Sequence, residues 1–546
     1  MKKILALILA SIFVLGILAG CGPSAPAPAA PGTPATPGAP ATPGTPATPG
    51  TPATPGTPAQ PGAEPAQQWR EEVIIGIHQI TTTTDPTAAT GAGHNIFFQL
   101  THGTLTRLNP DTGEVIPNIA TEWSIAPDNR TWTFTLRDDV YFHNGDRMTA
   151  EDWVFTIEHG KDAYNGTVRV FYNRIESAAA LDDTTLEVVL ESPNMDLLIT
   201  LTTPSFGVLS RRAIEADPLT GPGVGTGPFM NVDFVSGDFT LLERFDRFWG
   251  DMPYTRFLRF RFIPEGSARL IALQNGEIDV CQAPNNVELH LVHADPNIVM
   301  MPVQSTALTY FAFNLNRPHL QDVNLRRAIA HAINVQDLIY GAADGNATPA
   351  NAMWGFNQFG FFNDWASVGM EAYHFNMDRA REYMAASNSP DGIDLVFMTS
   401  TIWRINALQI VQHQLAPLGI NVIIDEVDAA GLASRAADGD YDVIMFSISF
   451  TEAGDDARRT LYPGMASNHA RFNNPRVNEL LNLAVAESDP AIRMEYYREI
   501  QIIVKQYAPY IPLYYANTGA AVKNELQGAR FMPNGAHNYH LVRMPA

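Results

Sequence analysis

The sequence predicts an α/β fold for the long part of the chain that follows a low-complexity N-terminal segment. Short strand patterns alternate with helical ones from Val73 onward, and a helix followed by a strand recurs late in the chain. About 480 residues follow the N-terminal segment and 45% of the chain is hydrophobic, which is enough for two or three domains. The formal net charge of −22 argues against nucleic acid and anionic lipid head groups as partners.

Residues 1–20 have the pattern of an export signal. Lys2 and Lys3 precede an uncharged apolar run that is too short to span a bilayer comfortably. Leu18, Ala19, Gly20 and Cys21 then resemble the lipobox of bacterial lipoproteins. This resemblance implies that the thiol of Cys21 receives a diacylglycerol and that Cys21 becomes the first mature residue. The alternative is an ordinary cleaved signal with an incidental cysteine.

Residues 21–68 repeat a TPATPG-like unit without apolar periodicity, so they cannot build a core. Proline favours polyproline II, and such a segment reaches at most about 140 Å. We expect a tether that holds the folded domain away from a membrane, and its threonines leave O-glycosylation open.

Several strands and helices are readable from periodicity. Trp132, Phe134 and Leu136 alternate with threonines as in a half-buried strand, and Leu186, Val188 and Leu190 repeat the pattern. The remaining signals are a capped helix start (Thr149 to Asp152, before Trp153 and Ile157), helical stripes (Leu408, Val411, Leu415; Tyr497, Ile500, Val504, Tyr507), and strands in "NVIIDEVD" and "YDVIMFSISF".

Motifs that would carry enzyme chemistry are weak or missing. The chain has no HExxH, GxSxG or P-loop, and the glycines from Gly221 to Gly227 lead into an extended pattern rather than a phosphate-binding helix. His537 and His540 are too few to define a metal site. With Cys21 lipidated, Cys281 is left alone and is expected to be a small buried side chain rather than a nucleophile.

A long stretch, "LTRLNPDTGEVIPNIATEWSIAPDNRTWTFTLRDDVYFHNGDRMTAEDWVFT", resembles the signature of bacterial extracellular solute-binding proteins of the oligopeptide, dipeptide and nickel class (family 5), the receptors of ABC importers. Further similar motifs follow in family order: "GTGPF" (225–229), "LLERFDRFWG" (241–250), "ALQNGEIDV" (272–280), "FAFNLNRP" (311–318), "VNLRRAIAHAIN" (323–334), "YDV" (441–443) and "APYIPLYY" (508–515).

The resemblance implies a two-lobed, periplasmic-binding-protein-like α/β fold, of type II and in the large three-domain variant, with a hinge and a ligand cleft between the lobes. Lobe 1 would combine 69–112, 230–315 and 511–546 with an inserted domain at 113–229, and lobe 2 would span 316–510. A ligand that contacts both lobes would favour the closed state, which a permease would recognise.

The implied ligand-contacting residues come from several segments. They are Thr81, Thr82, Thr309, Tyr310, Trp354, Trp403, Arg404, Phe450, Thr451 and Glu452. Peptide receptors of this class often carry Trp and then Asp after "YD", and the Asp pairs with the peptide ammonium. Here these places hold Ile448 and Thr451, with Glu452, Asp455 and Asp456 nearby. Sugars, opines and metal chelates therefore stand beside peptides as candidate ligands.

The sequence thus predicts a lipid-anchored, extracytoplasmic, monomeric receptor that takes peptides or a related small solute, without a cofactor and without enzymatic activity. Two other functions stay open. One is a sensory or chaperone-like binding protein with a signalling partner, and the other is an extracellular enzyme on a stalk, for which the motifs are missing.

Overall fold

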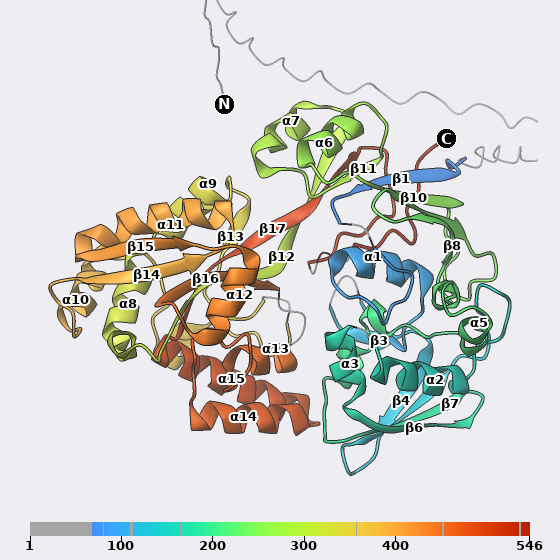
Figure 1. Ribbon diagram of the computed structural model, residues 1–546, viewed down its shortest axis with the longest axis horizontal. Helices are drawn as coiled ribbons and strands as arrows, with labels where there is room; N and C mark the ends of the chain where they lie inside the picture. The colour runs from blue at the N-terminus through green and yellow to red at the C-terminus, as the bar shows by residue number, and fades with distance from the viewer. Residues whose placement is uncertain are drawn as a thin grey trace, which may run out of the picture. The chain divides into compact units, whose positions relative to one another are not determined.

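The computed structural model describes residues 68–79, 81–109, 113–163, 165–355, 358–449, 453–533, 535 and 537–546 (Figure 1). The predicted signal, Cys21 and the predicted tether up to residue 67 lie outside these residues. Within the described part, none of the helices is both long and apolar enough to cross a membrane.

An 11-stranded mixed sheet forms the frame of the fold. Its order is β15-β14-β16-β12-β17-β11-β1-β10-β9-β8, and β13 pairs with β17 off this path. The strands are β1 (Glu72–Ile77), β8 (Phe229–Val235), β9 (Phe239–Arg244), β10 (Phe257–Phe262), β11 (Val280–Gln282), β12 (Ile298–Phe313), β13 (Ala347–Pro349), β14 (Ile393–Thr399), β15 (Ile420–Glu426), β16 (Val443–Ser449) and β17 (Tyr510–Lys523).

Two long strands, β12 and β17, connect the two ends of this sheet. They pair antiparallel from Ile298 opposite Lys523 onward, and their register is irregular between Gln304 and Tyr310. Figure 1 shows both strands passing from the group that holds β14 and β16 to the group that holds β1 and β11. This irregular register lies where the sheet changes from one lobe to the other. Bulges bend a strand and increase its twist locally, so they suit this position.

The first lobe is built on β1, β8 to β11 and the ends of β12 and β17. Helix α1 (Ala92–Thr101) contributes Phe98 and Leu100 to a core with Val73, Phe260 and Tyr539. A smaller core lies under α6 (Gly266–Gln274) and α7 (Leu289–Ala294), which directly follows η3 (Asn286–Glu288). This core includes Cys281, which is fully buried as predicted.

The segment between α1 and β8 folds around a core of its own, in which Phe134, Trp153 and Phe206 are buried with Leu105. A four-stranded antiparallel sheet, in the order β4-β5-β7-β6, packs against α2. The predicted boundary at residue 113 stays a prediction. The elements are β2 (Thr106–Leu108), β3 (Val115–Pro117), β4 (Ala120–Ile125), β5 (Thr131–Leu136), α2 (Ala150–Lys161), α3 (Gly166–Tyr172), β6 (Ile175–Asp182), β7 (Thr185–Leu190), α4 (Leu197–Thr200), η1 (Pro204–Phe206), α5 (Arg211–Ala216) and η2 (Gly221–Gly223).

In the second lobe the sheet is covered by helices on both faces. Phe311 of β12 lies in one core with Leu325 and Leu408, whereas its neighbour Tyr310 lies in another core with Tyr497. Successive side chains of a strand point to opposite faces, so one strand serves both cores. The helices are η4 (Pro318–Gln321), α8 (Val323–Ala332), α9 (Val335–Ala342), η5 (Trp365–Val368), α10 (Met377–Ala385), α11 (Ile402–Leu415), η6 (Ala416–Leu418), α12 (Ala429–Asp438), α13 (Ala453–Leu461), α14 (Pro475–Ala486) and α15 (Pro490–Tyr507).

The elements predicted from periodicity are confirmed. Trp132, Phe134 and Leu136 are buried on β5, and the predicted capped helix is α2, where Asp152 Oδ2 accepts a hydrogen bond from the Thr149 backbone N–H at 2.9 Å. The last predicted helical stripe is buried at Tyr497, Ile500 and Val504 but not at Tyr507. Tyr507, at the end of α15, is 49% exposed, because the helix ends there and the chain turns away through Ala508.

As predicted, no helix follows the glycine run, which leads into the extended strand β8. The structure also shows a packing role for its glycines. A Cβ on Gly225 would lie 1.9 Å from the backbone oxygen of Thr101, and one on Gly227 would lie 2.4 Å from that of Leu100. The chain can therefore pass the end of α1 only without side chains at these positions.

Candidate functional site

A large cavity lies between segments of the two lobes. Its volume is about 2460 Å³. Its lining combines α1, the loops around β2 and α4 and the C-terminal segment near Arg530 with Ser449, α13 and Arg493 of the second lobe. The residues that line it therefore come from distant parts of the chain, as expected of a site between lobes.

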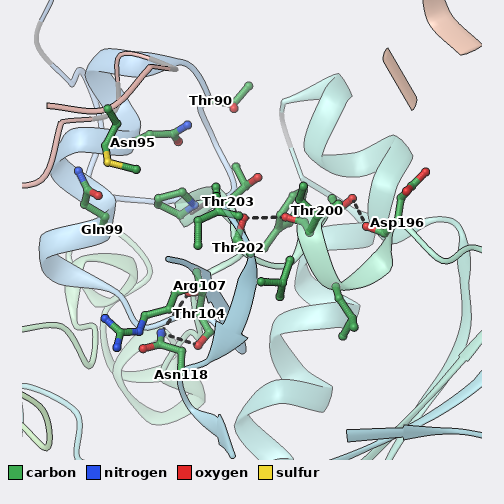
Figure 2. Close-up of a pocket in the computed structure, with 18 of the residues that line it drawn as sticks. Thr90, Asn95, Gln99, Thr104, Arg107, Asn118, Asp196, Thr200, Thr202 and Thr203 are labelled. Carbon is green, nitrogen blue, oxygen red and sulfur yellow. Dashed lines mark hydrogen bonds between the residues drawn. The ribbon is translucent and has the colours of Figure 1, made fainter. Parts of the chain in front are cut away.

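One wall of the cavity carries amides and hydroxyls (Figure 2). Asn95 and Gln99 stand one turn apart on α1, so they share a face of that helix. Asn118 donates from Nδ2 to the Thr104 backbone oxygen at 2.9 Å, and Arg107 is labelled beside it. These groups give the wall both donors and acceptors for a polar ligand.

A second group of threonines lies at the end of α4 and just after it. Thr200 donates from Oγ1 to the Asp196 backbone oxygen at 2.9 Å, and Thr202 donates in the same way to Ile199 at 2.7 Å. Together with Thr203 these residues line the cavity. The hydroxyls of Thr200 and Thr202 keep their lone pairs available as acceptors while their protons are held by the backbone.

The second lobe contributes charged residues from α13. Arg459 is paired with Asp456, at 2.6 Å between Nη2 and Oδ1, and it also donates to the Ser449 backbone oxygen at 2.8 Å. Arg458 donates to Asn482 Oδ1 at 2.8 Å and lies over the ring of Tyr462. This side of the cavity therefore presents guanidinium groups that protein contacts hold in place.

An ion pair joins the two lobes directly. Arg493 of α15 is paired with Asp196, and their side chains are only 14% and 3% exposed. Beside this pair the Met195 N–H donates to the Val485 backbone oxygen at 2.9 Å. A Cβ on Gly454 would lie 1.7 Å from Asp196 Oδ2, so the carboxylate fits against the first turn of α13 only because residue 454 is glycine.

Two histidines lie at this wall: His102 is buried and lines the cavity, and His143 is half-buried. The Gly225 N–H donates to His143 Nδ1 at 3.3 Å, and the opposite ring nitrogen lies 3.1 Å from the Gly227 oxygen. His102 Nε2 lies 2.9 Å from the Pro222 oxygen. Burial lowers the pKa of His102 to about 4 and that of His143 to about 3, so both are neutral at pH 7. His143 holds the "FHNG" and "GTGPF" segments together, and His102 holds the end of α1 against Pro222.

The residues predicted near the N-terminus do not line the described part of this cavity. Thr81 is buried and its hydroxyl donates to the Thr83 backbone oxygen at 2.5 Å, whereas Thr82 is exposed. Thr90, nine residues further along the chain, does line it.

Four further predicted residues, Thr309, Tyr310, Trp354 and Arg404, are buried, and none of them is part of the described lining. The Tyr310 hydroxyl lies 3.1 Å from His469 Nδ1, and the Thr309 hydroxyl lies 2.8 Å from Ser447 Oγ. Trp354 packs against Tyr497, and the guanidinium of Arg404 lies 5.4 Å from the ring centre of Phe446. Burial lowers the pKa of Arg404. Contact between a ligand and these four residues stays a prediction.

The predicted loop beyond β16 falls partly outside the structure. Phe450, Thr451 and Glu452 are not among the described residues, and neither is the side chain of Trp403. Ser449 before the loop and Asp456 after it both line the cavity.

Sequence reasoning missed most of the wall. The i, i+4 spacing of Asn95 and Gln99, opposite the apolar Phe97, was a readable signal on α1. No local signal marks Asp196 and Arg493, which are 297 residues apart.

The two C-terminal histidines make separate contacts. His537 Nδ1 accepts from the Met532 N–H at 3.0 Å, and His540 Nε2 lies 2.6 Å from the Asp251 oxygen. Among the described residues no group of three or more His, Cys, Asp or Glu side chains could hold a metal ion.

The fold and the cavity define the class of two-lobed, type II periplasmic binding proteins. The family model "Bacterial extracellular solute-binding proteins, family 5 Middle" matches residues 114–471, and the chain belongs to this family. The resemblance seen in the sequence motifs is thereby confirmed.

Individual proteins of the family are similar at low identity. The "Dipeptide-binding protein" of Escherichia coli K12 is 24% identical over 472 residues, which are 79% of this chain and 86% of that protein. The structure of "HbpA2 from Haemophilus parasuis" has a TM-score of 0.79 at 20% identity and covers 87% of this chain and 100% of that one. "DppA from Helicobacter pylori in complex with peptide STSA" has a TM-score of 0.70 at 23% identity and covers 88% and 99%.

Proposed function

We propose that the protein is a receptor of an ABC importer that captures di- or oligopeptides between its lobes and delivers them to a membrane permease. The cavity volume of about 2460 Å³ carries this proposal. Sites for small molecules usually measure roughly 300–1,000 Å³, so this cavity has room for several amino-acid residues. The names of the similar proteins from Escherichia coli and Helicobacter pylori, which refer to dipeptides and to a bound peptide, support it.

The receptor works by binding alone. A ligand that touches the wall of α1 and β2 and also α13 contacts both lobes at once. It then stabilises the closed arrangement, in which the lobes surround it, because it binds this arrangement more tightly than the open one. The permease recognises that arrangement and takes up the unchanged ligand, so no catalytic residue is required.

The loop 450–452 is our proposal for the contact with the peptide's amino terminus. Its neighbours Ser449 and Asp456 line the cavity, which supports this location. Glu452 would supply the carboxylate that Thr451 lacks, because a charge-assisted hydrogen bond to the ammonium requires an ionised acceptor.

A non-peptide solute is the second candidate. The amide and hydroxyl groups of Asn95, Gln99, Asn118 and Thr202 favour it, because such groups also suit the hydroxyls of a sugar or an opine. Thr451 in the place of a ligand-binding Asp points the same way.

We propose further that the monomeric protein is held at the outer face of the cytoplasmic membrane through lipidated Cys21. Two or more acyl chains give stable anchoring where one gives marginal binding. Cys21→Ser should release the protein into the medium, as detected by immunoblotting of culture supernatants. Retention of the variant in the membrane fraction would contradict the anchor.

The peptide function is tested by native mass spectrometry of the folded domain, purified without refolding, followed by a thermal-shift screen of peptides, sugars and metal chelates. We expect a heterogeneous set of short peptides to co-purify, and only peptides to raise the melting temperature. A single non-peptide species, with stabilisation by sugars or chelates alone, would replace the peptide function by the second candidate.

A further inference from the structure

The charge of the cavity lining is opposite in sign to the charge of the chain. Acidic residues outnumber Lys and Arg by 57 to 35 in the whole sequence. The described lining instead holds four acidic residues (Glu114, Asp196, Asp251, Asp456) and eight arginines (Arg107, Arg137, Arg169, Arg174, Arg458, Arg459, Arg493, Arg530).

Two of these arginines are neutralised within the lining. Arg493 is paired with Asp196 and Arg459 with Asp456, and both carboxylates are buried. Arg137 is paired outside the lining, with Asp139 at 2.6 Å between Nη2 and Oδ2. These contacts hold the wall together and leave other guanidinium groups to face the interior.

Three cavity arginines have no carboxylate partner within 4.0 Å among the described residues. Within the described part of the chain, the side chain of Arg107 donates only to the Pro117 backbone oxygen, at 3.4 Å, and that of Arg458 only to the neutral Asn482. Arg169, on α3, is exposed and forms no side-chain hydrogen bond with the described part of the chain. The three come from β2, α3 and α13, so both lobes contribute to this unneutralised charge.

We propose that the cavity selects ligands rich in carboxylates, and specifically peptides that carry Asp or Glu side chains, with Arg107, Arg169 and Arg458 as their partners. A guanidinium presents paired donors that match a carboxylate, and the attraction strengthens as water is excluded. An anion between the lobes also relieves the repulsion between their arginines and so favours the arrangement that surrounds it. This inference rests on the proposed peptide-binding function.

The test compares three pentapeptides of one length, Ala-Glu-Ala-Glu-Ala and its Gln and Lys counterparts, by isothermal titration calorimetry. We expect the Glu peptide to bind at least about tenfold more tightly than the Gln peptide and the Lys peptide to bind most weakly. The preference should shrink when NaCl is raised from 20 to 500 mM, because salt screens charges that remain partly hydrated.

Variants assign the preference to the cavity. Arg169→Gln and Arg107→Gln should each weaken the Glu peptide about five- to thirtyfold and leave the Gln peptide within about twofold. Both side chains are exposed, so the variants should fold. Arg381→Gln is the matched control, because it changes the net charge by the same amount as the two cavity variants. Arg381 is 58% exposed on α10 and is paired with Asp378. Its affinities should equal those of the unchanged protein.

Citrate distinguishes carboxylates carried by a peptide from those of a free polycarboxylate. Binding of the Glu peptide together with weak or absent binding of citrate supports the inference. Equal binding of Glu and Gln peptides overturns it and leaves the peptide function intact. Binding of citrate without any peptide overturns the peptide function and shows that the arginines serve a free polycarboxylate. An unchanged preference in Arg107→Gln and Arg169→Gln overturns the residue assignment.

Discussion

Breaking the ion pair between Asp196 and Arg493 should weaken the contact between the lobes. Arg493→Met removes the charge and keeps an unbranched apolar side chain at a position that is 14% exposed. Asp196, at 3% exposure, is then left as an uncompensated buried carboxylate. Removing one partner of a buried pair costs about 3–5 kcal/mol. Loss of the cation–π contacts of Arg493 with Phe359 and Tyr497 adds to this cost.

The assay is urea denaturation of Arg493→Met, Asp196→Leu and the double variant, combined with the radius of gyration from solution scattering. We expect a loss of about 3–5 kcal/mol in the free energy of unfolding for Arg493→Met. The double variant should be close to the unchanged protein, because an apolar pair removes both desolvation penalties. If the carboxylate instead regains water by separation of the lobes, the loss is smaller and the radius of gyration increases.

The matched control is Arg381→Met, which breaks the exposed pair with Asp378. An exposed pair contributes roughly 0–1 kcal/mol, so this variant should be nearly neutral. The reasoning would be refuted if Arg493→Met lost less than about 1 kcal/mol with an unchanged radius of gyration, and if the coupling in the cycle were near zero.

Three further predictions concern the stability of the protein: two follow from lowered pKa values and one from a closely packed glycine. Burial lowers the pKa of Lys505 to about 7. Between about pH 7 and 10.5 only the unfolded chain still binds this proton, so the free energy of unfolding should rise with pH there. Lys505→Met should flatten that rise in pH-dependent urea denaturation. The lowered pKa values of His102 and His143 act with the same sign at lower pH. Between about pH 6.5 and 4 only the unfolded chain binds their protons, so the free energy of unfolding should fall as the pH falls, and His143→Gln should reduce the slope by about one proton. Gly225→Ala should lower the free energy of unfolding by about 1–3 kcal/mol or more, because the new Cβ clashes with the Thr101 backbone. Gly166→Ala is the control and should be neutral, because nothing lies within 4 Å of its Cβ. Equal melting temperatures of the two variants would contradict the packing role.

The fold was predictable because its signals are local or belong to continuous motifs. Trp132, Phe134 and Leu136 alternate within one strand, and Leu408, Val411 and Leu415 repeat within one helix, so burial of each element follows from its own period. The motifs from "FHNG" to "APYIPLYY" then indicated the two-lobed arrangement, which the family match confirms.

The site was much less predictable, because its residues come together only through tertiary contacts. Tyr310 and Trp354 read as aromatic cleft residues, yet the structure buries both, since aromatic side chains serve a core as well as a pocket. The partner of Arg493 is 297 residues away, and nothing near either residue in the sequence indicates the pair. The polar face of α1, with Asn95 and Gln99, is the part of the wall that helical spacing could have revealed.

The position of β17 has a consequence for how the chain reaches its native state. This strand is among the last elements of the sequence, and it pairs with β11, β12 and β13 in the middle of the main sheet. Neither lobe can complete its sheet until residues 510–523 have been synthesised. Long-range pairing of this kind slows folding. A chain that must finish translation before it can fold stays unfolded for longer, and an unfolded polypeptide is the form that a narrow secretion channel can accept.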